Sequence, residues 1–322
     1  MSFRLNWDQL LSEKRQPLPE NVSRPATNAQ SASQARRTPF EKDFDRVIFS
    51  APFRRLARKT QVHPLDRVDH IHNRLTHSLE VASVGRPLAY AAGRLIVSRG
   101  EMPGGRTIED LNCIVQAARL AHDIGNPPFG HAGEYAIREW MNAEGHLLFG
   151  TDIAQCLNGV TREWLHFEGN AQSFRLVSRA DNREQSYFLF TYASLGALVK
   201  YPWDSSDQRV EKFQKLNVFS TEAEIYKDVV SELGLKRPDH TAARHPLSYL
   251  SEAADDKACR LLQADEEPIS TLTGEAFKSS GKDRRSENIT EKRRALIQLA
   301  KSISKPVHRS VKARNKSTAG GK

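Results

Sequence analysis

Cysteine is scarce in this sequence. The 322 residues contain three cysteines, Cys113, Cys156 and Cys259, which lie far apart and form no Cys-x-x-Cys pair. This spacing excludes a disulfide framework and a zinc site built from cysteines, and it favours a reducing compartment, the cytoplasm. Long apolar runs are also missing, since none approaches the roughly 18–20 residues of a membrane-spanning helix. The first residues lack the basic and then apolar pattern of a signal peptide, so we expect neither membrane insertion nor secretion.

The basic charge is concentrated at one end of the chain. The formal net charge is +9, but residues 278–322 hold 14 Lys and Arg against three Asp and Glu, while the remaining residues carry a net charge of −2. The high isoelectric point therefore describes a tail and not the globular body. A solvated tail is one interpretation of this segment. Binding of single-stranded DNA through counterion release is the other.

Alternating patterns of Val, Ile and Thr are almost absent, and the apolar spacing is mostly helical. One apolar stripe runs from Asp110 to Ala121, after a Thr107-x-x-Asp110 sequence that is typical of a capping box. A second apolar stripe comprises Leu79, Ala82, Leu88, Ala91, Ala92 and Leu95. Pro87 is expected to kink the helix that carries this stripe. A third helix is predicted over residues 222–233. These patterns predict an all-α protein.

Composition divides the chain into three segments. Residues 1–36 are rich in Pro, Ser, Gln and Asn and are expected to form a flexible leader. Residues 37–262 have the composition of one globular domain. Residues 263–322 are expected to be a basic, flexible segment, with a short helix over residues 291–303.

A His122-Asp123 pair stands out because of its surroundings, LAHDIGNPPFGHAGE. Pro127 and Pro128 prevent the preceding helix from continuing, so both side chains are expected at a helix C-terminus facing a tight loop. Only near a helix end can two adjacent residues reach one ion. An imidazole with a carboxylate suits a divalent cation such as Mn, Mg, Fe or Zn.

Further ligands for such an ion are available elsewhere in the chain. His77 lies in NRLTHSLEV, and SYLSEAADDKA contains Asp255 and Asp256 within an otherwise apolar stretch. Burying a carboxylate there without a cation is unfavourable. A capping role or a surface contact is the alternative for each of these residues, and spacing does not choose between the two aspartates.

Taken together, these segments resemble the HD-domain deoxynucleoside triphosphate triphosphohydrolases, the dGTPase-like proteins. The resemblance covers residues 37–256 through RTPFEKDFDRVIFSAPFRRLARKTQVHPL, RLTHSLEV, LAHDIGNPPFGHAGE, HFEGNAQSFRLVSR, TYASLGALVKYPW and HPLSYLSEAADD. It implies an α-helical HD bundle, an enzyme that needs a divalent metal, and assembly into a homo-oligomer. No membrane partner is expected.

The resemblance also implies roles for individual residues. Asp255 matches the first Asp of the family's Ala-Ala-Asp-Asp segment. His131 matches the residue proposed as general acid/base near the α-phosphate, and Glu134 the carboxylate that orients it. The metal ligands implied are His77, His122, Asp123 and Asp255. The substrate-binding residues implied are Arg74, Lys200 and Tyr201 near the triphosphate, Gln61 at the sugar 3′-hydroxyl, and Asn126 and Asn170 lining the site.

The sequence departs from the family after residue 256. Family members usually have a Tyr four residues after the first Asp and another Asp four residues later, where this chain has Cys259 and Gln263. The Tyr normally packs against the sugar, so the change bears on nucleotide affinity and deoxyribose selection. The family's Gly-Met-Thr-Asp segment near the nucleotide is also absent from this sequence.

The expected function is metal-dependent hydrolysis of deoxynucleoside triphosphates, dGTP foremost, to deoxynucleoside and inorganic triphosphate. Two alternatives remain: an HD phosphohydrolase of another nucleotide, and an inactive homologue that binds nucleotide or nucleic acid. The altered segment after Asp256 favours the latter.

Overall fold

A computed structural model of the chain describes residues 5–16, 37–61, 73–149, 163–179 and 188–263. In these ranges the regular structure is helical, with isolated bridges and no named strand, which confirms the all-α prediction. The expected short helix over residues 291–303, most of the leader, the tail and Cys156 lie outside the described ranges. The helices are α1 (Trp7–Leu10), α2 (Pro39–Ile48), α3 (Ala51–Arg55), η1 (Leu56–Arg58), α4 (Arg74–Ser98), α5 (Ile108–Ala121), α6 (His131–Glu144), α7 (His146–Phe149), α9 (Gly169–Ser178), α10 (Tyr192–Leu198), α11 (Arg209–Phe213), η2 (Ser220–Glu222), α12 (Ala223–Glu232) and α13 (Pro246–Gln263).

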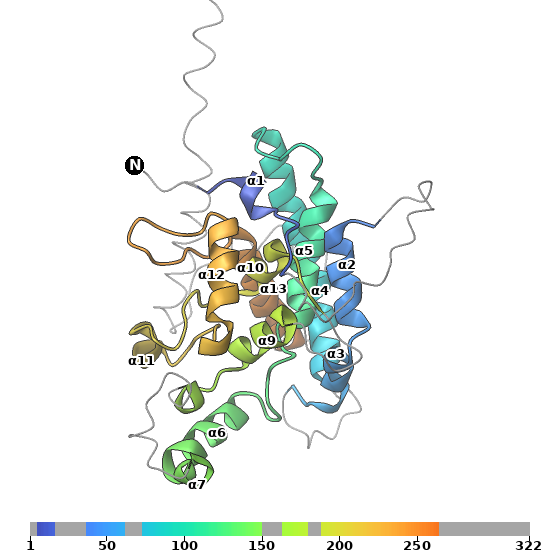
Figure 1. Ribbon diagram of the computed structural model, residues 1–322. Helices are drawn as coiled ribbons and strands as arrows, with labels where there is room; N and C mark the ends of the chain where they lie inside the picture. The colour runs from blue at the N-terminus through green and yellow to red at the C-terminus, as the bar shows by residue number, and fades with distance from the viewer. Residues whose placement is uncertain (1–4, 17–36, 62–72, 150–162, 180–187, 264–322) are drawn as a thin grey trace, which may run out of the picture. The chain divides into compact units, whose positions relative to one another are not determined.

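Helices α4 and α5 form the centre of the fold. They pack along each other, with α13 against α4 and α2 against α5, and α10 contacts both α5 and α13 (Figure 1). The largest core cluster draws on all of these helices, with Phe40, Ile114 and Tyr192 among its buried side chains. None of the described helices combines the length and apolar character that crossing a bilayer would require.

Helix α5 begins as its sequence predicts. The Thr107 hydroxyl accepts a hydrogen bond from the backbone N–H of Asp110, and the Asp110 carboxylate accepts one from the backbone N–H of Thr107. This reciprocal pair is a capping box, which satisfies two backbone donors at the helix start. The helix predicted over residues 222–233 is also present, as α12.

The predicted face of α4 is only partly correct. Ala82 is buried as predicted, but Leu79 and Leu95 are exposed. The helix also buries a row of small residues spaced four apart, Gly85, Ala89 and Gly93. A Cβ on Gly93 would lie 2.9 Å from the side chain of Ile108, so the row lets α5 approach closely. Helix α4 continues through Pro87, which lacks the backbone N–H that would otherwise donate to the preceding turn.

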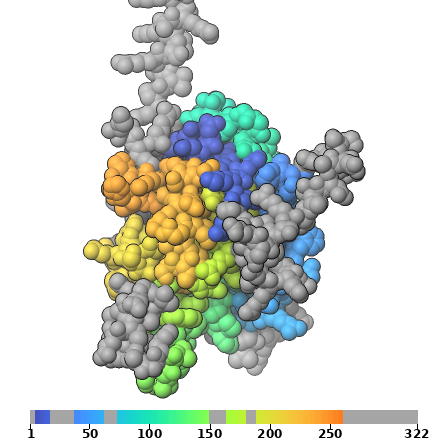
Figure 2. All heavy atoms as spheres, viewed as in Figure 1, coloured from blue at the N-terminus to red at the C-terminus, as the bar shows by residue number. Residues whose placement is uncertain are grey.

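Residues 5–16, which composition places in the flexible leader, pack against the folded body (Figure 2). Leu10 and Leu11 are fully buried in the main core. The Arg15 guanidinium donates to the buried carboxylate of Asp43 at 2.5 Å, and the Ser12 hydroxyl donates to Glu232 of α12 at 2.9 Å. Apolar burial and an internal ion pair therefore hold this segment in place, which composition alone did not indicate.

Candidate metal centre

Four predicted metal ligands converge from three separate parts of the chain: His77, His122, Asp123 and Asp255. His77 lies in the first turn of α4, His122 and Asp123 follow the end of α5, and Asp255 lies in α13. Ligand atoms of His77, His122 and Asp123 all lie within 4.8 Å of one another. An Asp255 carboxylate oxygen lies 3.1 Å from His77 Nε2 and 3.7 Å from His122 Nε2. We call these residues the four-residue cluster.

The orientation of His122 leaves one ring nitrogen for the cluster. Its Nδ1 lies 2.6 Å from the backbone carbonyl of Arg119, which can only accept, so Nδ1 carries the proton and donates. Nε2 is then the unprotonated nitrogen and faces the two carboxylates. In metal-binding histidines, the ring nitrogen that does not bind the metal typically donates a hydrogen bond of this kind, which fixes the orientation of the ring.

The loop after α5 is fixed by helix α9. The Ser173 hydroxyl donates to the carbonyl oxygen of His122 at 2.8 Å and accepts from the backbone N–H of Gly125 at 3.0 Å. A Cβ on Gly125 would lie 2.2 Å from the backbone nitrogen of Ser173 and 2.5 Å from the carbonyl oxygen of Gly169. Glycine is therefore required where this loop meets α9.

Two predicted substrate-binding residues contact the cluster directly. Arg74 donates to one carboxylate oxygen of Asp123 at 2.6 Å, and the Asn126 amide donates to the other at 2.6 Å. Both side chains thus hold the Asp123 carboxylate in place, a positioning role that the sequence does not reveal. Arg74 is buried, and its guanidinium lies so close to Gly130 that a Cβ there would be 2.3 Å from it.

The charges at the cluster favour the protonation states that bind cations. Burial raises the pKa of Asp255, but the neighbouring His122, His77 and Arg119 outweigh burial and hold the pKa below its usual range. Burial lowers the pKa of His122, more than Asp123 and Asp255 raise it. Carboxylate and neutral imidazole are the metal-binding forms of these side chains. The donor set of two imidazoles and two carboxylates fits a divalent cation.

The predicted acid/base pair is also present. His131 begins α6, and its Nδ1 lies 2.8 Å from a carboxylate oxygen of Glu134. The Glu134 carboxylate is buried and accepts from the backbone N–H of Gly169, whereas the His131 side chain is 73% exposed. Burial raises the pKa of Glu134, but His131, Lys215 and the Gly169 N–H together lower it further, so it is a carboxylate.

Lys200 and Tyr201 lie on the side of the cluster formed by α13. The Lys200 ammonium pairs with Glu252 at 3.2 Å, one turn before Asp255 in α13. Burial lowers the pKa of Lys200, but Tyr201, Glu252 and Asp255 raise it above its ordinary value, so it is a cation. The backbone N–H groups of Lys200 and Tyr201 both donate to the side-chain oxygen of Asn217.

Gln61 and Asn170 show no described contact with the cluster or with the acid/base pair. The Asn170 amide donates to Glu168 at the start of α9, 2.8 Å away, which is a helix-capping arrangement. The side-chain oxygen of Gln61 is buried without a hydrogen-bond partner among the described residues. Nine of the twelve predicted residues thus form or adjoin the cluster and the acid/base pair, whereas Gln61 and Asn170 do not. Tyr201 adjoins the cluster only through Lys200, whose ammonium lies 5.6 Å from the centroid of the Tyr201 ring.

Several residues at the site were not predicted. Lys59 donates to the Asn126 carbonyl at 2.7 Å, and burial followed by the nearby Arg74 lowers its pKa. Arg119 is buried beside Asp123 and Asp255, and Lys215 pairs with Glu168. From the sequence alone, lysine and arginine residues such as these are expected at the solvent-exposed surface. Their packing against carboxylates depends on tertiary structure.

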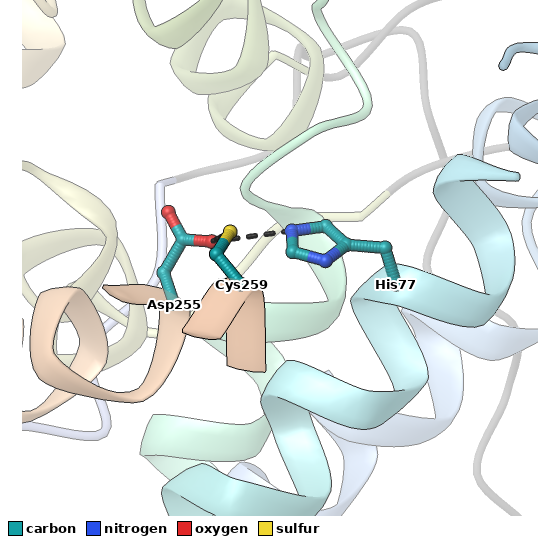
Figure 3. Close-up of side chains that lie close together, drawn as sticks. All are labelled: His77, Asp255 and Cys259. Carbon is teal, nitrogen blue, oxygen red and sulfur yellow. Dashed lines mark hydrogen bonds and ion pairs between the residues drawn. The ribbon is translucent and has the colours of Figure 1, made fainter. Parts of the chain in front are cut away.

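Cys259 also lies at the cluster. Its Sγ is 3.9 Å from Asp255 Oδ1, and the ligand atoms of Cys259, Asp255 and His77 all lie within 4.8 Å of one another (Figure 3). In the sequence, Cys259 is visible only as a departure from the family's Tyr. Burial, followed by Asp255 and Asp256, raises the pKa of the Cys259 thiol to about 11.

Comparison with known proteins identifies the domain that holds this site. Residues 74–183 match the HD domain, which includes His77, His122 and Asp123. A deoxyguanosinetriphosphate triphosphohydrolase-like protein of Pseudomonas aeruginosa strain LESB58 is 41% identical over 266 residues, 81% of this chain and 57% of that protein. A protein of the same description from Synechocystis is 39% identical, over 78% of this chain and 57% of its own length.

A third relative is named as a deoxyguanosinetriphosphate triphosphohydrolase, without the words "like protein". The deoxyguanosinetriphosphate triphosphohydrolase of Yersinia enterocolitica is 36% identical over 67% of this chain and 47% of its own length. The chain therefore spans about half the length of the curated relatives it matches. The resemblance seen in the sequence is confirmed by these matches.

Proposed function

Because this chain carries an HD domain and is related to deoxyguanosinetriphosphate triphosphohydrolase-like proteins, we propose that it is a metal-dependent phosphohydrolase of deoxynucleoside triphosphates, dGTP foremost. The products would be deoxynucleoside and inorganic triphosphate. The observation that carries this proposal is the convergence of two imidazoles and two carboxylates, with His77 and Asp255 separated by 178 residues in the sequence.

The four-residue cluster is the site that would hold the metal. When bound there, a divalent cation supplies Lewis-acid stabilisation of the negative charge that develops on a phosphoryl oxygen. Mn, Mg, Fe and Zn all accept imidazole or carboxylate ligands, so the donor set leaves four candidate metals.

Cationic side chains near the cluster would bind the triphosphate. Arg74 and Lys200 are both charged and held by carboxylates, so they present fixed donors to an anionic substrate. Tyr201 lies next to Lys200 and would contact the same phosphates. Gln61 would bind the sugar 3′-hydroxyl, with Asn126 and Asn170 lining the site.

His131 is the residue that we assign to proton transfer. Its Nδ1 is occupied by Glu134, while the exposure of the ring leaves Nε2 accessible. As a water oxygen forms a bond to the α-phosphorus, the bond from phosphorus to the 5′-oxygen breaks. His131 would give the 5′-oxygen its proton or accept the proton of the attacking water.

The residues at positions 259 and 263 favour a second candidate function, in which the substrate is another nucleotide. Cys259 and Gln263 replace a Tyr and an Asp that in the family lie at the sugar. An HD site with an altered sugar pocket would act on another nucleotide, or would bind nucleotide without turnover.

The experiment that tests the proposal is direct product analysis. Purified protein is incubated with each deoxynucleoside triphosphate and with Mn or Mg, and nucleoside and triphosphate are measured by chromatography. Triphosphate release supports the proposal, whereas release of monophosphate or diphosphate supports another phosphohydrolase.

The parent protein is compared with His122→Ala and Asp123→Ala, which should lose bound metal and turnover while the helical circular dichroism signal persists. The matched control is His146→Ala, which removes an exposed histidine of α7 and should change neither. Equal metal content in all four proteins would contradict the assignment of the cluster.

A further inference from the structure

Cys259 is a soft donor beside a cluster of nitrogen and oxygen donors. It follows Asp255 by four residues in α13, so both side chains lie on one face of that helix. Figure 3 shows its sulfur next to the Asp255 carboxylate, on the side that faces His77. A position that the family usually gives to an aromatic side chain is therefore occupied by a potential metal ligand.

The distances suit coordination of one ion. Metal–sulfur and metal–oxygen bonds of about 2.3 and 2.1 Å at a tetrahedral angle place the two ligand atoms about 3.6 Å apart. Sγ of Cys259 is 3.9 Å from Asp255 Oδ1, and that oxygen is 3.1 Å from His77 Nε2. Small side-chain movements would bring all three atoms to bonding distance of a common ion.

The surroundings can balance the added charge. Coordination would replace the thiol proton of Cys259 by the metal and release that proton, which leaves a thiolate beside Asp123 and Asp255. Arg119 and Lys200 are cations next to Asp255. They offset part of the negative charge that a third anionic ligand brings.

We propose that Cys259 is a ligand of the metal at this site and that it makes the centre selective for thiophilic ions such as Zn, Co and Cd over Mn and Mg. Thiolate ligands favour these softer ions, whereas carboxylates and water suit Mn and Mg. This inference rests on the metal centre of the proposed function, and it adds both a ligand and a metal preference that the four-residue cluster does not supply.

Cobalt spectroscopy of the full chain tests the ligand. Co²⁺ bound through a thiolate shows a sulfur-to-cobalt charge-transfer band in the near ultraviolet, besides the weak visible bands of any bound Co²⁺. The parent is expected to show both, and Cys259→Ser only the visible bands. The matched control is Cys113→Ser with Cys156→Ser, which leaves Cys259 as the single cysteine and should keep the charge-transfer band.

Metal competition tests the selectivity. Cys259→Ser is expected to weaken Cd²⁺ binding by about tenfold or more while leaving Mn²⁺ binding nearly unchanged. Alkylation provides a measurement on the unmodified chain. Zn²⁺ should protect Cys259 from iodoacetamide, as read by mass spectrometry of its peptide, and this holds even if the Ser variant fails to fold.

The outcomes separate the two proposals. Visible cobalt bands without a charge-transfer band, or a band that survives in Cys259→Ser, overturn the role of Cys259 and leave the metal centre standing. Alkylation that proceeds in the metal-free protein and is equal after Zn²⁺ has bound does the same; it is measured at a pH high enough for the metal-free thiol to react. If the parent binds no Co²⁺, Zn²⁺ or Mn²⁺, the metal centre of the proposed function falls together with this inference.

Discussion

At the scale of single residues, His131 and Glu134 form one hydrogen-bonded pair, in which the exposed imidazole is placed to transfer a proton and the buried carboxylate holds it in position. His131→Ala should lower turnover by about 10²–10⁴-fold, the usual contribution of one positioned acid/base group. Bound metal should stay unchanged, because His131 is not in the four-residue cluster. Steady-state kinetics and metal analysis of the same preparation check this, with His146→Ala as the control. Loss of metal in His131→Ala would instead place it among the ligands.

His245 makes the stability of the fold depend on pH. It is fully buried, its Nε2 donates to the Leu10 carbonyl, and its Nδ1 accepts from the backbone N–H of Leu247. A proton on Nδ1 would face that N–H, and burial lowers the pKa from 6.5 to about 4. Below the unfolded pKa the unfolded chain binds a proton that the folded chain does not. Stability is therefore lost as pH falls from about 6.5 towards 4.

The expected loss from this group is about 2 kcal/mol between pH 7 and pH 5. His245→Asn removes the titration but keeps a side-chain acceptor for the Leu247 N–H. Urea unfolding of both proteins at the two pH values measures the effect, and every other titrating group is common to both. A parallel loss of stability in the parent and the variant would show that His245 contributes nothing.

At the scale of elements, the packing of the α5 loop against α9 depends on Gly125. Gly125→Ala should destabilise the fold by about 1–3 kcal/mol or more, because the added carbon would meet backbone atoms of α9 that cannot rotate away. Gly104→Ala is the matched control, since a Cβ there meets nothing within 4 Å. Thermal unfolding of the two variants tests this, and equal melting temperatures would contradict it.

Elements with local signals were predictable from the sequence. The capping box of α5 involves only Thr107 and Asp110, so its pattern is complete within four residues. The buried face of α4 was predictable only in part, because apolar spacing favours leucines, whereas the packing buries Gly85 and Gly93 together with Ala82. Two helices can pack closely where glycine leaves out a side chain, and a search for apolar spacing does not detect such positions.

The candidate site also has a part that the sequence predicts and a part that only the fold shows. The resemblance to a family predicted four residues as metal ligands, and the structure brings two of them, His77 and His122, together with ring centroids 5.4 Å apart. The contacts of Arg74 with Asp123 and of Lys200 with Glu252 join residues far apart in the sequence. No spacing rule relates such pairs, so their partners became known only from the fold.

At the scale of the whole chain, charge and the metal site occupy different segments. Deletion of residues 278–322 removes a net charge of +11. It should abolish salt-sensitive binding of single-stranded DNA and leave metal content unchanged. Fluorescence anisotropy at several salt concentrations measures the binding. Equal affinity in the shortened protein would assign the interaction to a groove of the remaining chain.

The separation of 178 positions between His77 and Asp255 also sets an order of events during synthesis. At about 5–20 residues per second, a ribosome needs about 10–40 s to add the residues in between. Helices α4 and α5 leave the ribosome well before α13, so a nascent chain carries His77, His122 and Asp123 without Asp255 and Cys259. The four-residue cluster is complete only once translation has passed residue 255, so a metal ion that needs all four side chains cannot bind before that point.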